Sequence, residues 1–339
     1  MITKVVNSKS VTLKIYQGYG HTHNLVIYGH LLKGKQAVRE RFTHNIVYNI
    51  KHLFHLFRIH PIPNATIRLQ HADQVMETQT QSDGFFEFHW QSIQELTAGY
   101  HSITVSYLDE NNKIIQQVCG KLYIPHSVQI GIISDIDDTI LISYSSRMLK
   151  RLRVLFTRQP RSRKTFSDIV HYFNLLSLSH TNSQQPNPFF YVSSSEWNLY
   201  DDLTEFFAHN RLPSGVLLLN KIKQWHQLGA TGLTQHHNKQ VRIERIMRMF
   251  PKQRFILYGD NSQHDPDIYV SIAQAFPQNV IALYIRCVNP HKKSATMHTL
   301  SQLNDTTIHT LVFNHTREAM LHSVAIGLLS ADEISAVSN

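Results

Sequence analysis

Five short apolar runs recur through the second half of the chain, and segments with helical patterns lie between them. Each run has the length of a buried strand: QIGIIS (129–134), PFFYVS (188–193), GVLLLN (215–220), RFILYGD (254–260) and VIALYIR (280–286). Strands that alternate with helices pair in parallel through right-handed crossovers. The pattern therefore predicts an α/β fold with a parallel sheet, completed after residue 290 by one more strand and a closing helix.

A cluster of carboxylates follows the first of these runs. In GIISDIDDTI (131–140), Asp135, Asp137 and Asp138 come directly after an apolar strand. Burying like charges side by side is costly unless something compensates them. In open α/β sheets ligands bind outside the carboxyl ends of the strands, and Mg²⁺ prefers oxygen ligands. The cluster therefore predicts a cation site at this edge of the sheet.

Two more segments supply groups suited to the same site. Asp260 ends the fourth run, and Asp265 follows five residues later. Lys239 stands at the start of an amphipathic helix predicted over 237–250. A helix N-terminus with an ammonium group attracts anions. These residues predict a site that binds both a cation and a phosphate.

A run of serines ends the second strand. Ser193 is its last residue, and Ser194 and Ser195 follow. A serine hydroxyl just before a helix can accept a hydrogen bond from the helix's first N–H groups. Ser194 or Ser195 is therefore expected to cap the next helix, and Ser193 is expected to face the site.

These features stand in the order of the four motifs of the haloacid-dehalogenase superfamily: DIDDT (135–139), Ser193, Lys239 and GDNSQHD (259–265). Over about 128–330 the chain resembles more closely the catalytic domain of the actin-patch type of phosphatidate phosphatase. The closer resemblance rests on YVSSSEWNLY (191–200) and FILYGDNSQHDPDIY (255–269). Glu196 stands where that pattern usually has a proline, and Asn220 where it has an arginine. The resemblance implies a Rossmann-like sheet of the haloacid-dehalogenase type.

The resemblance also implies a phosphatase that converts phosphatidate to diacylglycerol and phosphate. Asp135 would attack the phosphorus and form an aspartyl-phosphate. Asp137 would protonate the leaving oxygen and then deprotonate the hydrolytic water, which it can do if neighbouring carboxylates raise its pKa. Thr139 would orient the loop, and Lys239 and Ser193 would hold the phosphoryl oxygens.

Magnesium is the cofactor that the resemblance implies. Asp135, the backbone carbonyl of Asp137 and Asp260 would bind it, and Asp265 would do so directly or through water. Asp265 also precedes Pro266, and an Asp-Pro pair commonly opens a helix, a role compatible with metal binding. Asp138 is expected to be a solvated or capping residue.

Two other functions stay open. One is a phosphatase of a soluble phosphoester, such as a sugar phosphate or a nucleotide. The other is a basic, non-catalytic binding module built on a phosphatase fold. Such a module would be expected to lack Asp135 or Asp260, and both are present.

The first 126 residues have a different pattern, with short alternating runs separated by turns. The runs are VTLKIY (11–16), LVIYGHL (25–31), ATIRLQ (65–70), GFFEFHW (84–90) and HSITVSYL (101–108). They predict a β-sandwich of immunoglobulin-like or transthyretin-like type, with one helix within 38–58. We therefore expect two domains, 1–126 and 127–335, with a small cap inserted at about 143–187.

The inserted cap carries much of the positive charge. Residues 147–164 contain eight Lys or Arg and no acid, in a chain with a formal net charge of +9. A basic amphipathic helix is typical of a membrane-surface element, and lipid contact is expected from Arg147, Lys150, Arg151 and Arg153. The alternative is that its apolar face packs on the catalytic core. Nucleic acid is not expected as a partner, because Phe156 is the only aromatic residue in this segment.

Composition suggests a reducing compartment. The chain has two cysteines, Cys119 and Cys287, and therefore no disulfide framework. The N-terminus lacks an apolar signal region, and no apolar stretch reaches about 18 residues. The expected location is the cytoplasm, with peripheral membrane contact.

Overall fold

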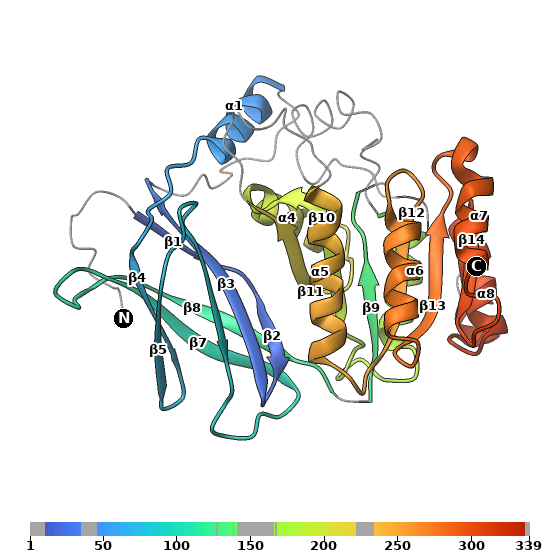
Figure 1. Ribbon diagram of the computed structural model, residues 1–339, viewed down its shortest axis with the longest axis horizontal. Coiled ribbons are helices and arrows are strands. Elements are labelled where there is room, and N and C mark those ends of the chain that lie inside the picture. Colours follow the sequence, from blue (N-terminus) through green and yellow to red (C-terminus); the bar gives the residue numbers. More distant parts are fainter. Residues whose placement is uncertain are drawn as a thin grey trace. The chain divides into compact units, whose positions relative to one another are not determined.

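The computed structural model describes residues 11–34, 46–126, 128–137, 139–140, 166, 168–221 and 234–335. These residues divide into two compact units, and the division falls within helix α1 (Ile46–Phe57). The first unit holds residues 11–34 and 54–126, and the second holds 46–53 and the described residues from 128 onward. Each unit contains a sheet of its own (Figure 1).

The sheet of the first unit has eight strands. They are β1 (Val11–Ile15), β2 (Gly18–His21), β3 (Asn24–Lys33), β4 (Thr66–His71), β5 (Gln74–Gln79), β6 (Phe85–Trp90), β7 (Gly99–Leu108) and β8 (Ile114–Ile124). The order is β1-β3-β2-β8-β7-β4-β5, with β6 paired to β3. Neighbouring strands are antiparallel except β2 and β8, which are parallel. All five strands predicted in this region are present, and β2, β5 and β8 were not predicted.

Alternation along the strands builds the core of this unit. In β6, Phe86, Phe88 and Trp90 are buried, and in β4 Ile67 and Leu69 are buried. These side chains belong to one apolar cluster that also includes residues of β3, β7 and β8. Buried and exposed side chains therefore alternate along these strands, as expected for a half-buried strand, and this alternation fixes the register in which the strands pair.

A glycine permits the turn that leads into β6. Gly84 has φ +75°, a left-handed conformation that side chains disfavour. Its N–H donates to the carbonyl of Gln81, and the side chain of Asp83 accepts from the N–H of Phe85. Asp83 and Gly84 therefore form one of the turns predicted between the alternating runs.

The sheet of the second unit is parallel throughout. Its strands are β9 (Ile130–Ser134), β10 (Phe189–Glu196), β11 (Gly215–Asn220), β12 (Arg254–Asp260), β13 (Val280–Arg286) and β14 (His309–Phe313). Their order is β11-β10-β9-β12-β13-β14, and every neighbouring pair is parallel. The predicted α/β fold with a parallel sheet is confirmed, and β9 and β12 are neighbours near its middle.

Helices connect these strands and cover both faces of the sheet. They are α3 (Ile169–Leu178), α4 (Tyr200–His209), α5 (Thr234–Met249), α6 (Asp265–Ala275), α7 (Lys293–Ser301), α8 (Thr316–Ala325) and α9 (Ala331–Ser335), with single turns at Trp197–Leu199 and Pro290–Lys292. Strand β10 shows the two faces: Tyr191 packs on Phe207 of α4, and Phe190 packs on Phe250 at the end of α5. Figure 1 shows α5 and α6 side by side on one face.

Helix α3 lies in the segment predicted as a cap. Its Tyr172 and Phe173 are buried and contact Tyr258 of β12. The hydroxyl of Tyr172 also lies 2.8 Å from Oγ of Ser323 on α8. This part of 143–187 therefore packs on the parallel sheet.

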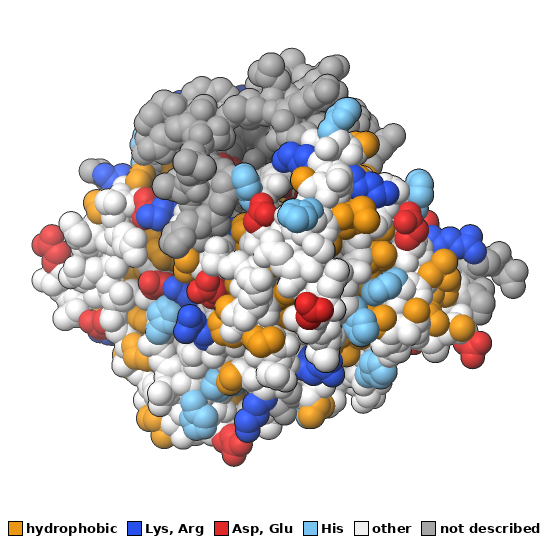
Figure 2. All heavy atoms as spheres, turned by 45° about the vertical axis from the view of Figure 1, so that its right-hand side comes forward, with side chains coloured by type: hydrophobic (Ala, Val, Ile, Leu, Met, Phe, Trp, Pro, Cys, Tyr) orange, Lys and Arg blue, Asp and Glu red, His pale blue; other side chains and the backbone are white. Residues whose placement is uncertain are grey.

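Two surface properties bear on function. None of the helices in the described ranges combines the length and apolar character needed to span a bilayer. Histidine side chains are spread over the face drawn in Figure 2, among acidic, basic and apolar groups. The abundance of histidine therefore does not by itself mark a binding site on that face.

Candidate active site

The carboxyl ends of β9 and β12 bring two acidic residues together. Asp135 follows the last residue of β9, and Asp260 is the last residue of β12. The two strands pair in parallel, with Ser134 opposite Tyr258, and the N–H of Asp135 donates to the carbonyl of Tyr258 at 2.9 Å. Their ends therefore meet at one edge of the sheet, as the sequence predicted.

Asp265, the first residue of α6, completes a cluster of three carboxylates. One oxygen from each of Asp135, Asp260 and Asp265 lies within 4.8 Å of the others, and all three side chains are buried. No other group of three His, Cys, Asp or Glu side chains among the described residues meets the same condition. The side chain of Asp265 also accepts from the N–H of Asp260 at 3.4 Å, which ties the start of α6 to the end of β12.

Glycine at position 259 makes room for this arrangement. A Cβ atom there would lie 2.5 Å from Oδ2 of Asp265 and 2.8 Å from the ring of Tyr269. Both distances are shorter than van der Waals contact allows. The absence of a side chain at Gly259 therefore lets the Asp265 carboxylate approach the strand end.

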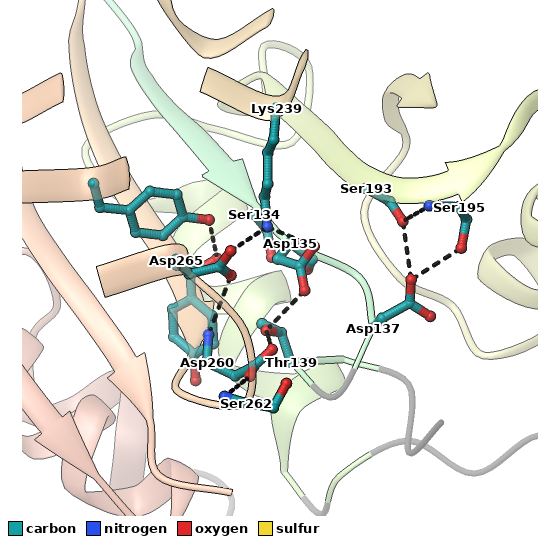
Figure 3. A network of polar contacts seen from close by, with 12 residues as sticks. Ser134, Asp135, Asp137, Thr139, Ser193, Ser195, Lys239, Asp260, Ser262 and Asp265 are labelled. Atoms are coloured by element: carbon teal, nitrogen blue, oxygen red, sulfur yellow. Dashed lines mark hydrogen bonds and ion pairs between the residues drawn. The ribbon is translucent and has the colours of Figure 1, made fainter. Parts of the chain in front are cut away.

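Lys239 reaches the same cluster from α5. Its ammonium nitrogen lies 2.8 Å from Oδ1 of Asp135 and 2.5 Å from Oδ1 of Asp265 (Figure 3). The lysine side chain is buried, although a lysine is usually solvated. Helix α5 therefore places a cation between two carboxylates that come from β9 and α6.

Two further donors fix the carboxylates. The hydroxyl of Thr139 lies 3.2 Å from Oδ2 of Asp260 and 3.4 Å from Oδ2 of Asp135. The N–H of Ser262 donates to Oδ1 of Asp260 at 2.5 Å. Hydrogen bonds of this kind hold an acidic side chain in one rotamer. Thr139 therefore links the two strand ends, and Ser262 orients Asp260.

Burial and mutual repulsion shift the ionisation of the cluster. Burial, reinforced by Asp265 and Asp260, raises the pKa of Asp135 well above its usual range despite the opposing effect of Lys239. Burial, reinforced by Asp265, raises the pKa of Asp260 to about 7. Burial alone would lower the pKa of Lys239, but the charges of Asp135 and Asp265 outweigh it and raise that pKa. Three carboxylates facing one ammonium thus leave excess negative charge in a buried site.

The arrangement suits a divalent cation. Its donors are carboxylate oxygens, the ligands that Mg²⁺ prefers, and they come from three segments that meet at one point. A bound cation would also offset the excess charge that raises the pKa values of Asp135 and Asp260. Asp135, Asp260 and Asp265 therefore fit a metal site on charge and donor chemistry.

Asp137 and Ser193 form a second group beside this cluster. Oδ2 of Asp137 accepts from the hydroxyls of Ser193 at 3.1 Å and Ser195 at 2.9 Å. The N–H of Ser195 donates to the hydroxyl oxygen of Ser193 at 2.9 Å. Figure 3 shows the Asp137 carboxylate directed toward these serines, away from Asp265. The Asp137 carboxylate is not a member of the three-carboxylate cluster.

The prediction that Ser194 or Ser195 caps a helix is wrong. Strand β10 runs through Glu196, and Glu196 itself precedes the single turn 197–199. The strand is irregular between Val192 and Glu196, and within this stretch the hydroxyls of Ser193 and Ser195 both reach Asp137. The spacing of two between these serines was the available sequence signal for Ser195, and the expected cap obscured it.

Some predicted residues lie outside the part of the chain that the structure describes. They are Asp138 in the acidic motif and the basic residues Arg147, Lys150, Arg151 and Arg153. The structure does bring together Asp135, Thr139, Lys239, Asp260 and Asp265, and it places Asp137 with Ser193. It adds Gly259, Ser195 and Ser262, which were not predicted as site residues.

Comparison with known proteins identifies the segment that carries this site. Residues 130–287 match the family model of the catalytic domain of phosphatidate phosphatase APP1. Phosphatidate phosphatase APP1 of Saccharomyces cerevisiae is 30% identical over 182 residues, which cover 52% of this chain and 29% of the yeast protein. An uncharacterized protein of Schizosaccharomyces pombe is 25% identical over 183 residues, which cover 52% of this chain and 28% of that protein.

These matches cover only part of each relative and part of this chain. The chain spans less than a third of the length of either relative. Among solved structures, a carbohydrate acetylesterase from Xanthomonas citri aligns with 94% of this chain and 75% of its own, but with a TM-score of 0.32 and 8% identity, which supports no conclusion. The match over 130–287 includes the acidic motif, Ser193, Lys239 and Asp260–Asp265. Residues 130–287 are therefore similar to the catalytic domain of phosphatidate phosphatase APP1.

Proposed function

We propose that this chain is a Mg²⁺-dependent phosphatase that hydrolyses phosphatidate to diacylglycerol and phosphate. The observation that carries the proposal is the convergence of Asp135, Asp260 and Asp265 around the ammonium group of Lys239. The similarity of 130–287 to the APP1 catalytic domain supports the substrate, since the yeast relative is named a phosphatidate phosphatase. We also propose that the sheet is of the haloacid-dehalogenase type.

The three clustered carboxylates would hold the cation, together with the backbone carbonyl of Asp137. All are oxygen donors, and three buried carboxylates that face one ammonium group need further compensating charge. When bound, Mg²⁺ would offset the charge of the carboxylates and of the phosphoryl oxygens. Asp265 serves both as a partner of Lys239 and as the first residue of α6.

Asp135 is the proposed nucleophile. One of its carboxylate oxygens forms a bond to phosphorus as the bond between phosphorus and the leaving oxygen breaks, which gives an aspartyl-phosphate. Lys239 lies on Oδ1 of Asp135 and Thr139 lies near Oδ2, so the carboxylate is held from both sides. The ammonium group of Lys239 also favours the negative charge that the phosphoryl oxygens carry.

Asp137 is the proposed proton carrier. It would protonate the leaving oxygen in the first step and take a proton from the attacking water in the second. Its carboxylate lies on the Ser193 side of the site, apart from the Asp135–Asp260–Asp265 cluster. That separation supports different roles for two carboxylates only two residues apart.

The basic segment 147–164 is the proposed membrane contact. A phosphatase of a lipid must reach a substrate that resides in a bilayer, and Lys and Arg are attracted to anionic lipid surfaces. Eight basic residues without an acid suit that role. Arg147, Lys150, Arg151 and Arg153 are the residues we assign to it.

The test is phosphate release across a substrate panel, with Mg²⁺ and with a chelator. The panel contains short-chain phosphatidate, a sugar phosphate and a nucleoside monophosphate. We expect Mg²⁺-dependent release with the highest kcat/KM on phosphatidate. Release from the soluble esters alone would contradict the lipid substrate, and release from none would contradict phosphatase activity.

A further inference from the structure

Ser195 is a buried residue to which the proposed catalytic steps assign no role. It is 3% exposed, lies two residues beyond Ser193 on β10, and belongs to neither the carboxylate cluster nor a helix cap. Its hydroxyl donates a hydrogen bond to Asp137, and its N–H donates one to Ser193. Burying a hydroxyl at a strand end is unfavourable unless the hydroxyl is bonded, so its bonding pattern is informative.

The bonds of Ser195 converge on one oxygen of Asp137. Its hydroxyl donates to Oδ2 of Asp137 at 2.9 Å. Its N–H donates to Oγ of Ser193, whose hydroxyl donates to the same Oδ2 at 3.1 Å. Both serine hydroxyls thus bond Oδ2, and Oδ1 is the carboxylate oxygen that neither of them bonds. The two serines therefore distinguish the two oxygens of this carboxylate.

Ser193 cannot hold Asp137 throughout the reaction. A serine hydroxyl has a single proton to donate. When the Ser193 hydroxyl donates to a phosphoryl oxygen, as proposed above, it no longer donates to Asp137. Ser195 is then the serine that still fixes Oδ2, and its side chain is directed at Asp137 from the same side of the strand.

We propose that Ser195 is a positioning residue that keeps Oδ1 of Asp137 aimed at the leaving oxygen of the substrate. The inference rests on the proposed function. In the step concerned, the electron pair of the breaking P–O bond passes to the leaving oxygen, which takes the proton from Oδ1. The resulting carboxylate stays bonded to Ser195 and can accept the proton of the attacking water in the second step.

Leaving-group dependence distinguishes this role from a merely structural one. A poor alkoxide leaving group needs the proton, whereas 2,4-dinitrophenolate departs without one. We expect Ser195→Ala to lower kcat/KM on short-chain phosphatidate by about tenfold or more, since positioned proton transfer contributes about 10²–10⁴-fold. On 2,4-dinitrophenyl phosphate kcat/KM, which reports only the steps up to the departure of the leaving group, should fall less than about twofold. Ser195→Thr, which keeps the hydroxyl, should restore most of the lost rate.

Ser194→Ala is the matched control. Ser194 is also buried, but the two hydroxyls that bond Asp137 belong to Ser193 and Ser195. The Ser194→Ala change should leave kcat/KM on both esters unchanged. Ser195→Ala should keep an unfolding midpoint within about 5 °C of the wild type. If Ser195→Ala does not fold, Ser195→Thr is compared with Ser195→Cys, which has a weaker donor. The ratio of kcat/KM on phosphatidate to kcat/KM on 2,4-dinitrophenyl phosphate should then be lower in the cysteine variant than in the threonine variant.

The outcomes separate the inference from the proposed function. Equal losses on both esters, or no loss on phosphatidate, would overturn the role of Ser195 while leaving the phosphatase intact. A wild-type chain inert toward both esters would contradict the phosphatase itself, and the role of Ser195 with it. A loss confined to phosphatidate and restored by threonine supports the inference.

Discussion

The ammonium nitrogen of Lys239 on α5 lies 2.8 Å from Oδ1 of Asp135 at the end of β9, and both side chains are buried. The same nitrogen lies 2.5 Å from Asp265. Removing one member of a buried ion pair leaves its partner uncompensated, which is more costly than never having built the pair. The contact therefore gives Lys239 a part in stability besides the phosphate binding proposed for it.

Lys239→Met is predicted to destabilise the protein by about 3–5 kcal/mol and to abolish phosphate release. The loss of stability arises because Asp135 and Asp265 remain buried without the ammonium group of Lys239. Urea unfolding of both proteins in the presence of a chelator measures this loss. Lys292→Met is the control, since that ammonium group bonds only a carbonyl near the site, that of Ser262, and should cost less than about 1.5 kcal/mol. Equal unfolding midpoints for Lys239→Met and the wild type would contradict the buried ion pair.

Asp260 is predicted to make the metal-free protein less stable as pH rises. Its pKa is raised from the usual 3.8 to about 7 in the folded state, so the folded chain retains a proton that the unfolded chain has lost. Its contribution is fully present below about pH 4 and is lost as pH rises to about 7, on the order of a few kcal/mol. Asp260→Asn should remove this dependence and raise the free energy of unfolding at pH 8.

The measurement is urea unfolding of Asp260→Asn and wild type between pH 4 and pH 8 in a chelator. The difference between the two is the useful quantity, because burial lowers the pKa of His30 to about 3 and gives an opposite slope in both proteins. A difference that does not grow with pH would contradict the raised pKa. Mg²⁺ at pH 8 should stabilise the wild type and have much less effect on Asp260→Asn.

Sequence patterns predicted the second unit well because its strands are continuous apolar runs. Each strand from β9 to β13 falls within one residue of a predicted run at its start, and the acidic residues sit where those runs end. Strand β5, QVMETQ, was missed because its side chains are partly or fully exposed along both faces, which leaves no apolar alternation. Periodicity can reveal only strands that bury a face.

The contacts that hold the site residues in place could not be predicted from residue types. Ser195 was expected to cap a helix, but β10 continues three residues past Ser193, through Glu196, and the Ser195 hydroxyl bonds Asp137. The requirement for glycine at 259 depends on where α6 begins relative to β12, a tertiary relationship. Asp265 opens a helix and joins the carboxylate cluster, so the two readings of that residue are compatible.

Gly259→Ala is predicted to weaken the site without touching a charged group. The added Cβ would meet Oδ2 of Asp265 and push that carboxylate, or the strand end, out of place. Overpacking of this kind costs about 1–3 kcal/mol. The stabilisation of the protein by Mg²⁺, measured as a shift in unfolding midpoint, should also shrink. An unchanged Mg²⁺ shift would show that Asp265 needs no such clearance.

Charge reversal in the basic segment is predicted to impair membrane binding. Each Lys or Arg near an anionic bilayer contributes about 1 kcal/mol, so Arg151→Glu with Arg153→Glu should weaken binding to phosphatidate-containing liposomes at least about tenfold. Binding of the wild type should fall steeply with added salt. Lys113→Glu with Lys252→Glu changes the net charge equally at exposed positions elsewhere and is the control. Liposome binding unmoved by salt and by the Arg151 and Arg153 changes would remove the case for a lipid contact.

The most direct measurement is Mg²⁺-dependent phosphate release from short-chain phosphatidate by the wild type and by Asp135→Asn. Asparagine keeps the shape of the side chain but cannot attack phosphorus as a carboxylate does. We predict release by the wild type that stops in a chelator, and none by Asp135→Asn, with folding verified by circular dichroism. Full activity in the folded Asp135→Asn protein would contradict Asp135 as the nucleophile.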